Sequence, residues 1–154
     1  MQKLHFSIQI NAPREKVWKT MLDDKTYRVW TVPFNSSGSG ESWFEGDWSK
    51  GSDIKFVGPD KSGKLGGMIA KVEENKPNEF ISLKHFGIIG EDGKVEINSE
   101  ESKKWAPAME NYTFKNADEG TELSIDVDCA DEYLNFFNES WPKALVILKE
   151  ISEK

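Results

Sequence analysis

The sequence is poor in the residue types on which many catalytic and metal-binding sites depend. Its 154 residues include one cysteine, Cys129, and two histidines, His5 and His85. A single cysteine cannot form an intrachain disulfide, which fits a reducing cytoplasm. The sequence has no Cys pair or His-Glu-x-x-His motif for zinc, and no phosphate-binding loop motif. We therefore expect no metal, no cofactor and a cytoplasmic location.

The sequence also lacks an excess of basic charge and a long apolar run. Twenty Lys and Arg stand against 27 Asp and Glu, which gives a net charge of −7 at pH 7. Nucleic acids and anionic membranes attract proteins through basic surfaces, so neither is expected as a partner. No stretch of about 18 apolar residues is available to cross a membrane, and MQKLHFSIQI does not resemble a secretion signal. We expect no membrane insertion.

Large apolar side chains, by contrast, are plentiful. The chain has six tryptophans and nine phenylalanines. A protein of this length typically buries roughly two-thirds of the surface that its unfolded chain exposes, so a substantial core is possible. No linker or internal repeat divides the sequence. We therefore expect residues 1–154 to form a single domain.

The first third of the sequence predicts one strand and two short helices. Apolar and polar residues alternate over residues 4–10, which indicates a half-buried strand. In NAPREKVWKTMLDD, Pro13 suits the first turn of a helix, and the apolar residues after it recur with helical spacing. Asp23 or Asp24 is placed to cap a second helix that reaches Trp30. The segment NSSGSG that follows is predicted to be a loop.

Six further strands and a long helix are predicted after this loop. The strands are SWFEGDW, SDIKFVG, GGMIAKVEE, EFISLKHFG, MENYTFK and TELSIDVDC, each bounded by turn residues. Between EFISLKHFG and MENYTFK, Asn98 or Ser99 suggests a capped helical turn. The chain ends in an apolar stripe at helical spacing, interrupted by Pro142. We expect a short helical piece and then a long helix that begins near Asn138 or Ser140.

The order of these elements predicts an α+β fold. Strands and helices are segregated along the chain instead of alternating. A seven-stranded antiparallel sheet, with two short helices and one long C-terminal helix lying across it, would bury all the apolar patterns at once.

Several motifs resemble those of START-like proteins, the SRPBCC superfamily. INAPREKVWKTMLDDKTYRVW resembles the opening motif of the branch named after the activator of the heat-shock-protein-ninety ATPase. EGDWSKGSDIKF, ENYTF, GTELSIDVD and WPKALVILKEI resemble the later strands and the closing helix of that branch. The resemblance covers essentially the whole chain. It implies a helix-grip fold, in which a curved antiparallel sheet wraps around the last helix and encloses a cavity.

The resemblance implies no single activity. Members of the superfamily include lipid carriers, polyketide cyclases and aromatases, plant hormone receptors and co-chaperone domains. The eukaryotic co-chaperone also has a separate N-terminal domain that grips the chaperone, and the 154 residues contain no counterpart to it. We therefore expect no strong stimulation of the chaperone's ATPase.

The residues expected to face the cavity follow from alternation along the strands. Trp30 and Phe34 would close one end, and Phe137 and Trp141 would come from the last helix. The alternative is that these side chains simply fill a solid core. The inward candidates on the strands are Trp43, Ile54, Phe56, Met68, Ala70, Val72, Ile81, Leu83, His85, Tyr112 and Phe114.

One histidine stands out because it follows apolar residues inward. Ile81, Leu83 and His85 share one face of EFISLKHFG, and Glu110 shares a face with Tyr112 in ENYTF. Pairing of these two strands would bring His85 close to Glu110, and each is a natural partner for the other. The pair could be a satisfied polar contact, a group that orients a ligand, or a general acid–base pair.

We predict that the protein binds an apolar or amphipathic small molecule, such as a lipid, in this cavity without transforming it. The first alternative is a stress-related module that interacts with a chaperone. The second is a cyclase- or isomerase-type enzyme that uses His85 and Glu110. No catalytic residue is assigned. An exposed apolar patch outside the cavity would favour the chaperone module, and a perturbed acid and base inside it would favour the enzyme.

Overall fold

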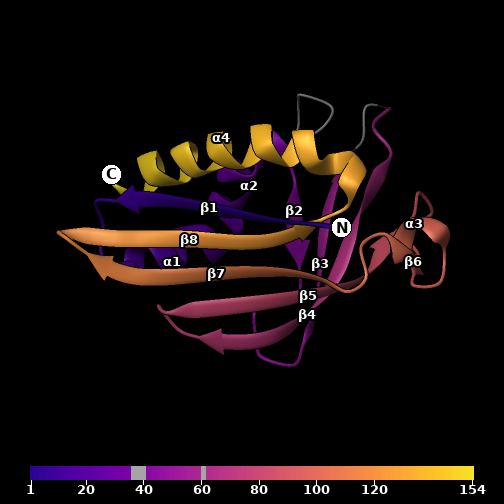
Figure 1. Ribbon diagram of the computed structural model, residues 1–154, viewed down its shortest axis with the longest axis horizontal. Coiled ribbons are helices and arrows are strands. Elements are labelled where there is room, and N and C mark those ends of the chain that lie inside the picture. Colours follow the sequence, from indigo (N-terminus) through magenta and orange to yellow (C-terminus); the bar gives the residue numbers. More distant parts are fainter. Residues whose placement is uncertain (36–40, 60–61) are drawn as a thin grey trace.

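The first strand, β1 (Gln2–Ile10), pairs with the last strand of the chain, β8 (Gly120–Cys129), and not with the strand that follows it. In the computed structural model, all neighbours in the order β1-β8-β7-β5-β4-β3-β2 are antiparallel. The predicted seven-stranded antiparallel sheet is therefore confirmed, and it curves beneath the last helix (Figure 1). The other strands are β2 (Trp43–Glu45), β3 (Asp53–Pro59), β4 (Leu65–Lys76), β5 (Phe80–Ile89) and β7 (Ala108–Ala117).

The structure describes residues 1–35, 41–59 and 62–154. The loop predicted at NSSGSG lies, apart from Asn35, outside the described residues. An additional strand of two residues, β6 (Val95–Glu96), pairs with the end of β5. After it, α3 (Glu100–Lys103) begins where a capped turn was predicted, because the Ser99 hydroxyl accepts a hydrogen bond from the Ser102 backbone N–H at 3.1 Å. Both β6 and α3 lie at one end of the molecule (Figure 1).

The two short helices before the sheet are α1 (Arg14–Leu22) and α2 (Asp24–Trp30), followed by the 3₁₀ helix η1 (Val32–Phe34). Pro13 directly precedes α1, and Asp23 directly precedes α2, close to the predicted positions. The indole N–H of Trp30 donates to the Met21 carbonyl at 3.0 Å and so ties the end of α2 back to α1. This bond fixes the position at which the chain enters η1.

The last helix, α4 (Leu134–Ser152), differs from its prediction. It begins at Leu134, directly after the 3₁₀ helix η2 (Asp131–Tyr133), and continues through Pro142. A start near Asn138 or Ser140 is therefore wrong. Proline removes one backbone hydrogen bond. The helix continues because the apolar stripe does not break there, and Trp141, Ala144 and Leu145 are all buried on its inner side. It packs against β1, α1, α2 and η1.

Two β-bulges interrupt the pairing of β4 with β5. Ile69 pairs with Gly87, but the next residue, Ala70, pairs with His85, so Phe86 is an extra residue in β5. Paired residues share a face, so His85 and Ile88, the partner of Met68, face the same side although they are three residues apart. The second bulge lies in β4, between Val72 and Glu74.

Most buried side chains form one hydrophobic cluster on the inner face of the sheet, which includes residues of α1, α2 and α4. A smaller cluster around Trp105 and Cys129 continues it at the end near α3. Cys129 is buried and unpaired, as an ordinary apolar core residue. In the part of the chain that the structure describes, no helix is both long and apolar enough to cross a membrane.

Candidate ligand-binding cavity

A cavity of about 660 Å³ lies between the inner face of the sheet and α4. Its wall includes residues of α2, η1, β3, β4, β5, β7 and α4. Most of the wall is aromatic or aliphatic, with a few polar groups among these side chains. Small-molecule pockets in proteins typically measure about 300–1,000 Å³ and have this kind of lining. The cavity therefore has the size and the surface of a binding site.

Nine of the eleven predicted site residues line this cavity. They come from both sides, because the strand residues project inward from the sheet and the aromatic residues of η1 and α4 face them. The nine are Trp30, Phe34, Phe56, Met68, His85, Glu110, Tyr112, Phe137 and Trp141. The remaining two, Trp43 and Leu83, do not belong to the lining.

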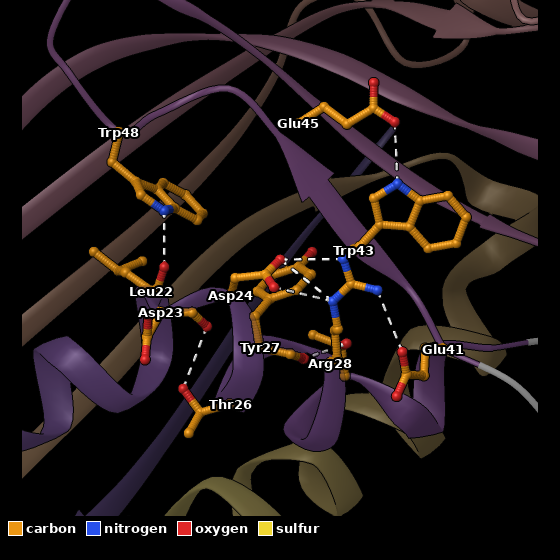
Figure 2. Close-up of polar contacts among 11 residues, drawn as sticks. Leu22, Asp23, Asp24, Thr26, Tyr27, Arg28, Glu41, Trp43, Glu45 and Trp48 are labelled. Atoms are coloured by element: carbon orange, nitrogen blue, oxygen red, sulfur yellow. Dashed lines mark hydrogen bonds and ion pairs between the residues drawn. The ribbon is translucent and has the colours of Figure 1, made fainter.

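Trp43 lies on the other side of β2. Phe44 packs against the main hydrophobic cluster, with its ring centroid 5.1 Å from that of Tyr27, so Phe44 is the β2 residue that faces inward. The Trp43 indole N–H donates to Glu45, as Figure 2 shows. The donor–acceptor distance is 3.0 Å, and the Arg28 guanidinium carbon lies 5.7 Å from the Trp43 ring centroid. Two polar neighbours hold Trp43 in place. The predicted inward set was therefore out of phase by one residue in β2.

Leu83 has the predicted direction but lies beyond the cavity. It is fully buried and belongs to the same hydrophobic cluster as Val17 and Met21 of α1. Its partners across the sheet are Val72 and Glu110. Its side chain has no accessible surface and does not border the cavity. Alternation predicts on which face a side chain lies, but it does not predict whether that face is covered.

His85 and Glu110 meet at the cavity wall, as predicted from their strands. His85 Nε2 lies 3.0 Å from Glu110 Oε1. Leu83 pairs with Glu110 and His85 with Ala108, so the two side chains are diagonal neighbours. His85 is only 5% exposed, and its other ring nitrogen, Nδ1, is buried with no hydrogen-bond partner among the described residues. One polar atom of the pair is therefore left unsatisfied.

Tyr27 is a cavity residue that sequence reasoning did not select. Its ring packs edge-on against Trp30 and Phe44, with centroids 5.4 and 5.1 Å away. Burial, with a smaller contribution from the charge of Glu110, raises the pKa of the Tyr27 hydroxyl well above its ordinary value. The spacing of Tyr27 three residues before Trp30 on α2 was the signal for a shared face.

The indole of Trp141 is a second unsatisfied group in the cavity wall. Its Nε1 is buried and has no hydrogen-bond partner among the described residues. Trp30, whose ring centroid lies 6.2 Å away, donates its N–H to Met21, and Trp48 donates to the Leu22 carbonyl at 3.0 Å. The indoles of Trp30 and Trp48 are thus satisfied by backbone carbonyls, whereas Trp141 has no such partner among the described residues.

Carboxylates gather on the side of the cavity formed by the segment between β5 and β7. Glu91, Glu96 and Glu101 line it there, in addition to Glu110. Lys64 also lines the cavity and forms an ion pair with Glu91 at 3.2 Å. Within the described ranges, no group of three or more His, Cys, Asp or Glu residues is arranged to hold a metal ion.

Comparison with known proteins places this chain in a family. The sequence model described as "Activator of Hsp90 ATPase homolog 1-like protein" matches residues 11–153. The chain belongs to this family. The search of the curated proteins returned no match.

Solved structures similar to this family member share its fold. A protein from Chromobacterium violaceum is 18% identical, with a TM-score of 0.75, and the match covers 100% of this chain and 99% of that one. The solution structure of the Aha1 dimer from Colwellia psychrerythraea is 20% identical, with a TM-score of 0.70 and 99% and 97% coverage. An AHSA1-like protein from Aeromonas hydrophila is 15% identical, with a TM-score of 0.67 and 97% and 90% coverage. The fold is thus shared with these proteins at low sequence identity.

Proposed function

We propose that the protein binds a mostly apolar small molecule in the cavity between the sheet and α4, without transforming it chemically. The observation that carries the proposal is the cavity itself, about 660 Å³ and lined mostly by aromatic and aliphatic side chains. A void of this size forfeits packing contacts that a solid core would gain. A ligand that fills it would restore these contacts.

The contacts of the ligand follow from the geometry of the wall. Phe34 of η1 and Trp141 of α4 pack edge-on, with their ring centroids 4.8 Å apart. The cavity wall on the side of the sheet includes Phe56 and Met68, which pair across β3 and β4. We assign the ligand contacts to the nine predicted residues that line the cavity, together with Tyr27. Rigid rings on both sides favour a flat, ring-containing ligand because flat surfaces stack without a large loss of side-chain entropy.

A thermal-shift screen of ring-containing and long-chain apolar compounds tests the proposal. A ligand at 100 times its Kd stabilises the folded state by about 2.7 kcal/mol, which corresponds to roughly 5–10 °C in a chain of this size. Met68→Trp should fill the space and abolish the shift. The matched control is Lys84→Trp, which adds the same ring to an exposed position of β5.

The screen can also contradict the proposal. Equal shifts in the parent and in Met68→Trp would mean that the compounds bind elsewhere. A broad screen with no shift in the parent would remove the proposal, since a competent cavity of this volume should accept at least some of the compounds.

A chaperone-binding role is the second candidate, favoured by the description of the family. Val29 on α2 and Val32 on η1 are 47% and 41% exposed, and neither lines the cavity. A protein partner would gain apolar contact at these two positions. The test is the ATPase rate of an Hsp90-class chaperone mixed with this protein. Several-fold stimulation at near-stoichiometric amounts, lost in Val29→Asp, would promote this role over small-molecule binding.

A further inference from the structure

Glu110 places a carboxylate in the wall of the apolar cavity. Its Oε1 lies 3.0 Å from His85 Nε2, and its second oxygen, Oε2, is not part of this contact. The side chain of Glu110 is 19% exposed and lines the cavity, so a molecule inside the cavity can reach the carboxylate. Small-molecule pockets usually combine an apolar wall with a few polar groups that orient the ligand. Glu110 is therefore a candidate contact for the polar group of a ligand.

The partner of Glu110 distinguishes it from two other carboxylates of the lining. Glu91 forms an ion pair with Lys64 at 3.2 Å, and the lysine compensates its charge. Glu101 is compensated in the same way by Lys104, also at 3.2 Å. Glu110 faces a histidine instead, and a neutral imidazole satisfies one carboxylate oxygen without cancelling the negative charge. With the ring in this state, the charge of Glu110 is available to a ligand.

Aromatic rings lie around this charge. Tyr112 follows Glu110 by two residues on the inner face of β7, and both line the cavity. Tyr27 and Phe56 are half-buried lining residues with ring centroids 6.2 Å apart, and the Phe56 ring lies 5.8 Å from that of His85. Burial raises the pKa of Tyr27, and the charge of Glu110 raises it further, so the phenol lies within electrostatic range of the carboxylate.

A carboxylate among aromatic rings favours a positively charged group. The face of an aromatic ring carries partial negative charge and attracts an ammonium ion, and the carboxylate adds a direct attraction and a hydrogen-bond acceptor. Folding has already removed water from much of Glu110, so a cation that binds there does not bear this part of the desolvation cost. An anionic group at the same place would lie next to a like charge.

We propose that the ligand is a ring-containing molecule with a protonated amine, which donates a charge-assisted hydrogen bond to Glu110 Oε2 while its apolar part packs among the aromatic residues of the cavity. This inference rests on the proposed function, since it names the ligand class for the same cavity. It goes further in assigning Glu110 as the residue that selects amines over neutral and anionic molecules of the same shape.

Three probes with one ring system test the inference in NMR titrations of the protein: 2-(aminomethyl)naphthalene, 2-(hydroxymethyl)naphthalene and 2-naphthoate. The amine and the alcohol have nearly the same shape, so they differ mainly in charge. We expect the amine to bind about three- to tenfold more tightly than the alcohol, the difference typical of a hydrogen bond that gains a charge. The carboxylate should bind more weakly than both.

Two matched variants show whether the selectivity comes from Glu110. In Glu110→Gln the affinity for the amine should fall to about that for the alcohol, and the affinity for the alcohol should stay within about twofold. Glu101→Gln is the control, because it removes another lining carboxylate whose charge Lys104 already compensates. The selectivity for the amine should be kept in this variant. An equal loss in both variants would mean that the amine responds to the overall charge of the wall, and the inference would be wrong.

The outcomes separate the inference from the proposed function. Equal binding of the amine and the alcohol to the parent protein would overturn the inference and leave the proposed function in place. Tightest binding of 2-naphthoate would also overturn it. If none of the three probes binds but the thermal-shift screen yields another ligand, the inference is wrong and the proposed function stands. Failure of both experiments removes both proposals.

The parent protein provides a second measurement that needs no variant. In its complex with the amine, the methylene protons next to the ammonium group should give NOEs to the ring protons of Tyr27 or Tyr112, because these rings lie near Glu110. NOEs from the same protons to Leu65, a lining residue at the start of β4, would place the ammonium group elsewhere in the cavity and contradict the assignment of Glu110.

Discussion

Leu83 and His85 lie two residues apart on the same face of β5, but what covers them differs. Leu83 is fully buried and does not line the cavity, whereas His85 does line it. At the end of the inner face that lies beneath α1, which we call the filled end, Trp18 packs edge-on against Phe114, with ring centroids 5.1 Å apart. At the other end, which we call the hollow end, aromatic rings of η1 and of the first part of α4 line the cavity. The same strand pattern therefore serves as core or as binding wall, and the helices above it decide which.

The two histidines offer a comparison of the same kind across the sheet. His5 lies directly opposite Asp126, with Nδ1 2.7 Å from the carboxylate, and both side chains are more than half exposed. His85 lies 3.0 Å from Glu110, and their side chains are 6% and 19% exposed. The shorter contact is the one in water, where the solvent competes for both partners. Burial, more than distance, decides which pair contributes to stability.

Truncation at the filled end should have the largest effect. Leu83→Ala should lower the free energy of unfolding by about 2–5 kcal/mol, because it leaves a cavity in packed surroundings. Met68→Ala, at the hollow end, should cost clearly less because the side chain already borders free space. Urea unfolding of both variants measures the difference. Equal losses would mean that the two ends are packed alike.

Alkaline pH should destabilise the hollow end through Tyr27. The pKa of its hydroxyl is raised in the folded state, so above about pH 10 the unfolded chain releases this proton and the folded chain keeps it. Stability should fall with rising pH by about 1.4 kcal/mol per unit from this group alone. Tyr27→Phe should remove that part of the slope.

Urea unfolding between pH 8 and pH 11.5 compares the two proteins. Tyr133, whose pKa is also raised by burial, titrates in both and cancels in the difference. Parallel slopes above pH 10 would show that the Tyr27 hydroxyl is well hydrated and that the hollow end is wet.

The buried and exposed histidine pairs should respond differently to loss of charge. Glu110→Gln should lower the free energy of unfolding by about 1–2 kcal/mol, because the charge-assisted bond to His85 is lost in a buried setting. Asp126→Asn, the matched change beside His5, should cost about 0.5 kcal/mol or less. A double-mutant cycle with His85→Gln should give a coupling of roughly 0.5–3 kcal/mol. Similar losses of unfolding free energy in Glu110→Gln and Asp126→Asn would show that burial does not strengthen the His85–Glu110 contact.

The smallest effect is expected on the outer side of β2. Trp43→Phe should leave any ligand-induced thermal shift unchanged, because the Trp43 ring lies against Arg28 and Glu45 and does not line the cavity. Phe44→Ala should reduce the shift, since Phe44 packs on Tyr27 in the cavity wall. A loss of the shift in Trp43→Phe would mean that the ligand enters or binds beside Arg28.

The sequence was most informative where a pattern of residues was compatible with a single structure. The order of strands and helices led to the α+β fold, and the family motifs to the helix-grip arrangement. The meeting of His85 with Glu110 followed from two polar exceptions on apolar faces. Pro142 misled the prediction of α4 because local propensity was outweighed by the packing of Trp141 and its neighbours.

The site was less accessible to sequence reasoning, for geometric reasons. The phase of a three-residue strand such as β2 depends on its partner, so Trp43 and Phe44 could not be told apart by alternation. Whether the space over Leu83 is filled depends on how the helices dock on the sheet, which no spacing within the strand records. The unsatisfied Nε1 of Trp141 is visible only when all its neighbours are in place.

The extra residue at Phe86 changes which residues of β5 face inward: odd-numbered residues before it and even-numbered residues after it. Before it, the odd-numbered residues through His85 lie on the inner face of the sheet; after it, the even-numbered Ile88 shares the face of Met68. Deletion of one residue here would move each later side chain of β5 to the opposite face of the sheet. A substitution would leave the direction of these side chains unchanged. In chains that share 20% or less of their residues, an alignment that misses this bulge would equate wall residues with outer residues. The number of residues in β5 around Phe86 therefore decides, together with their identity, which side chains form the cavity wall.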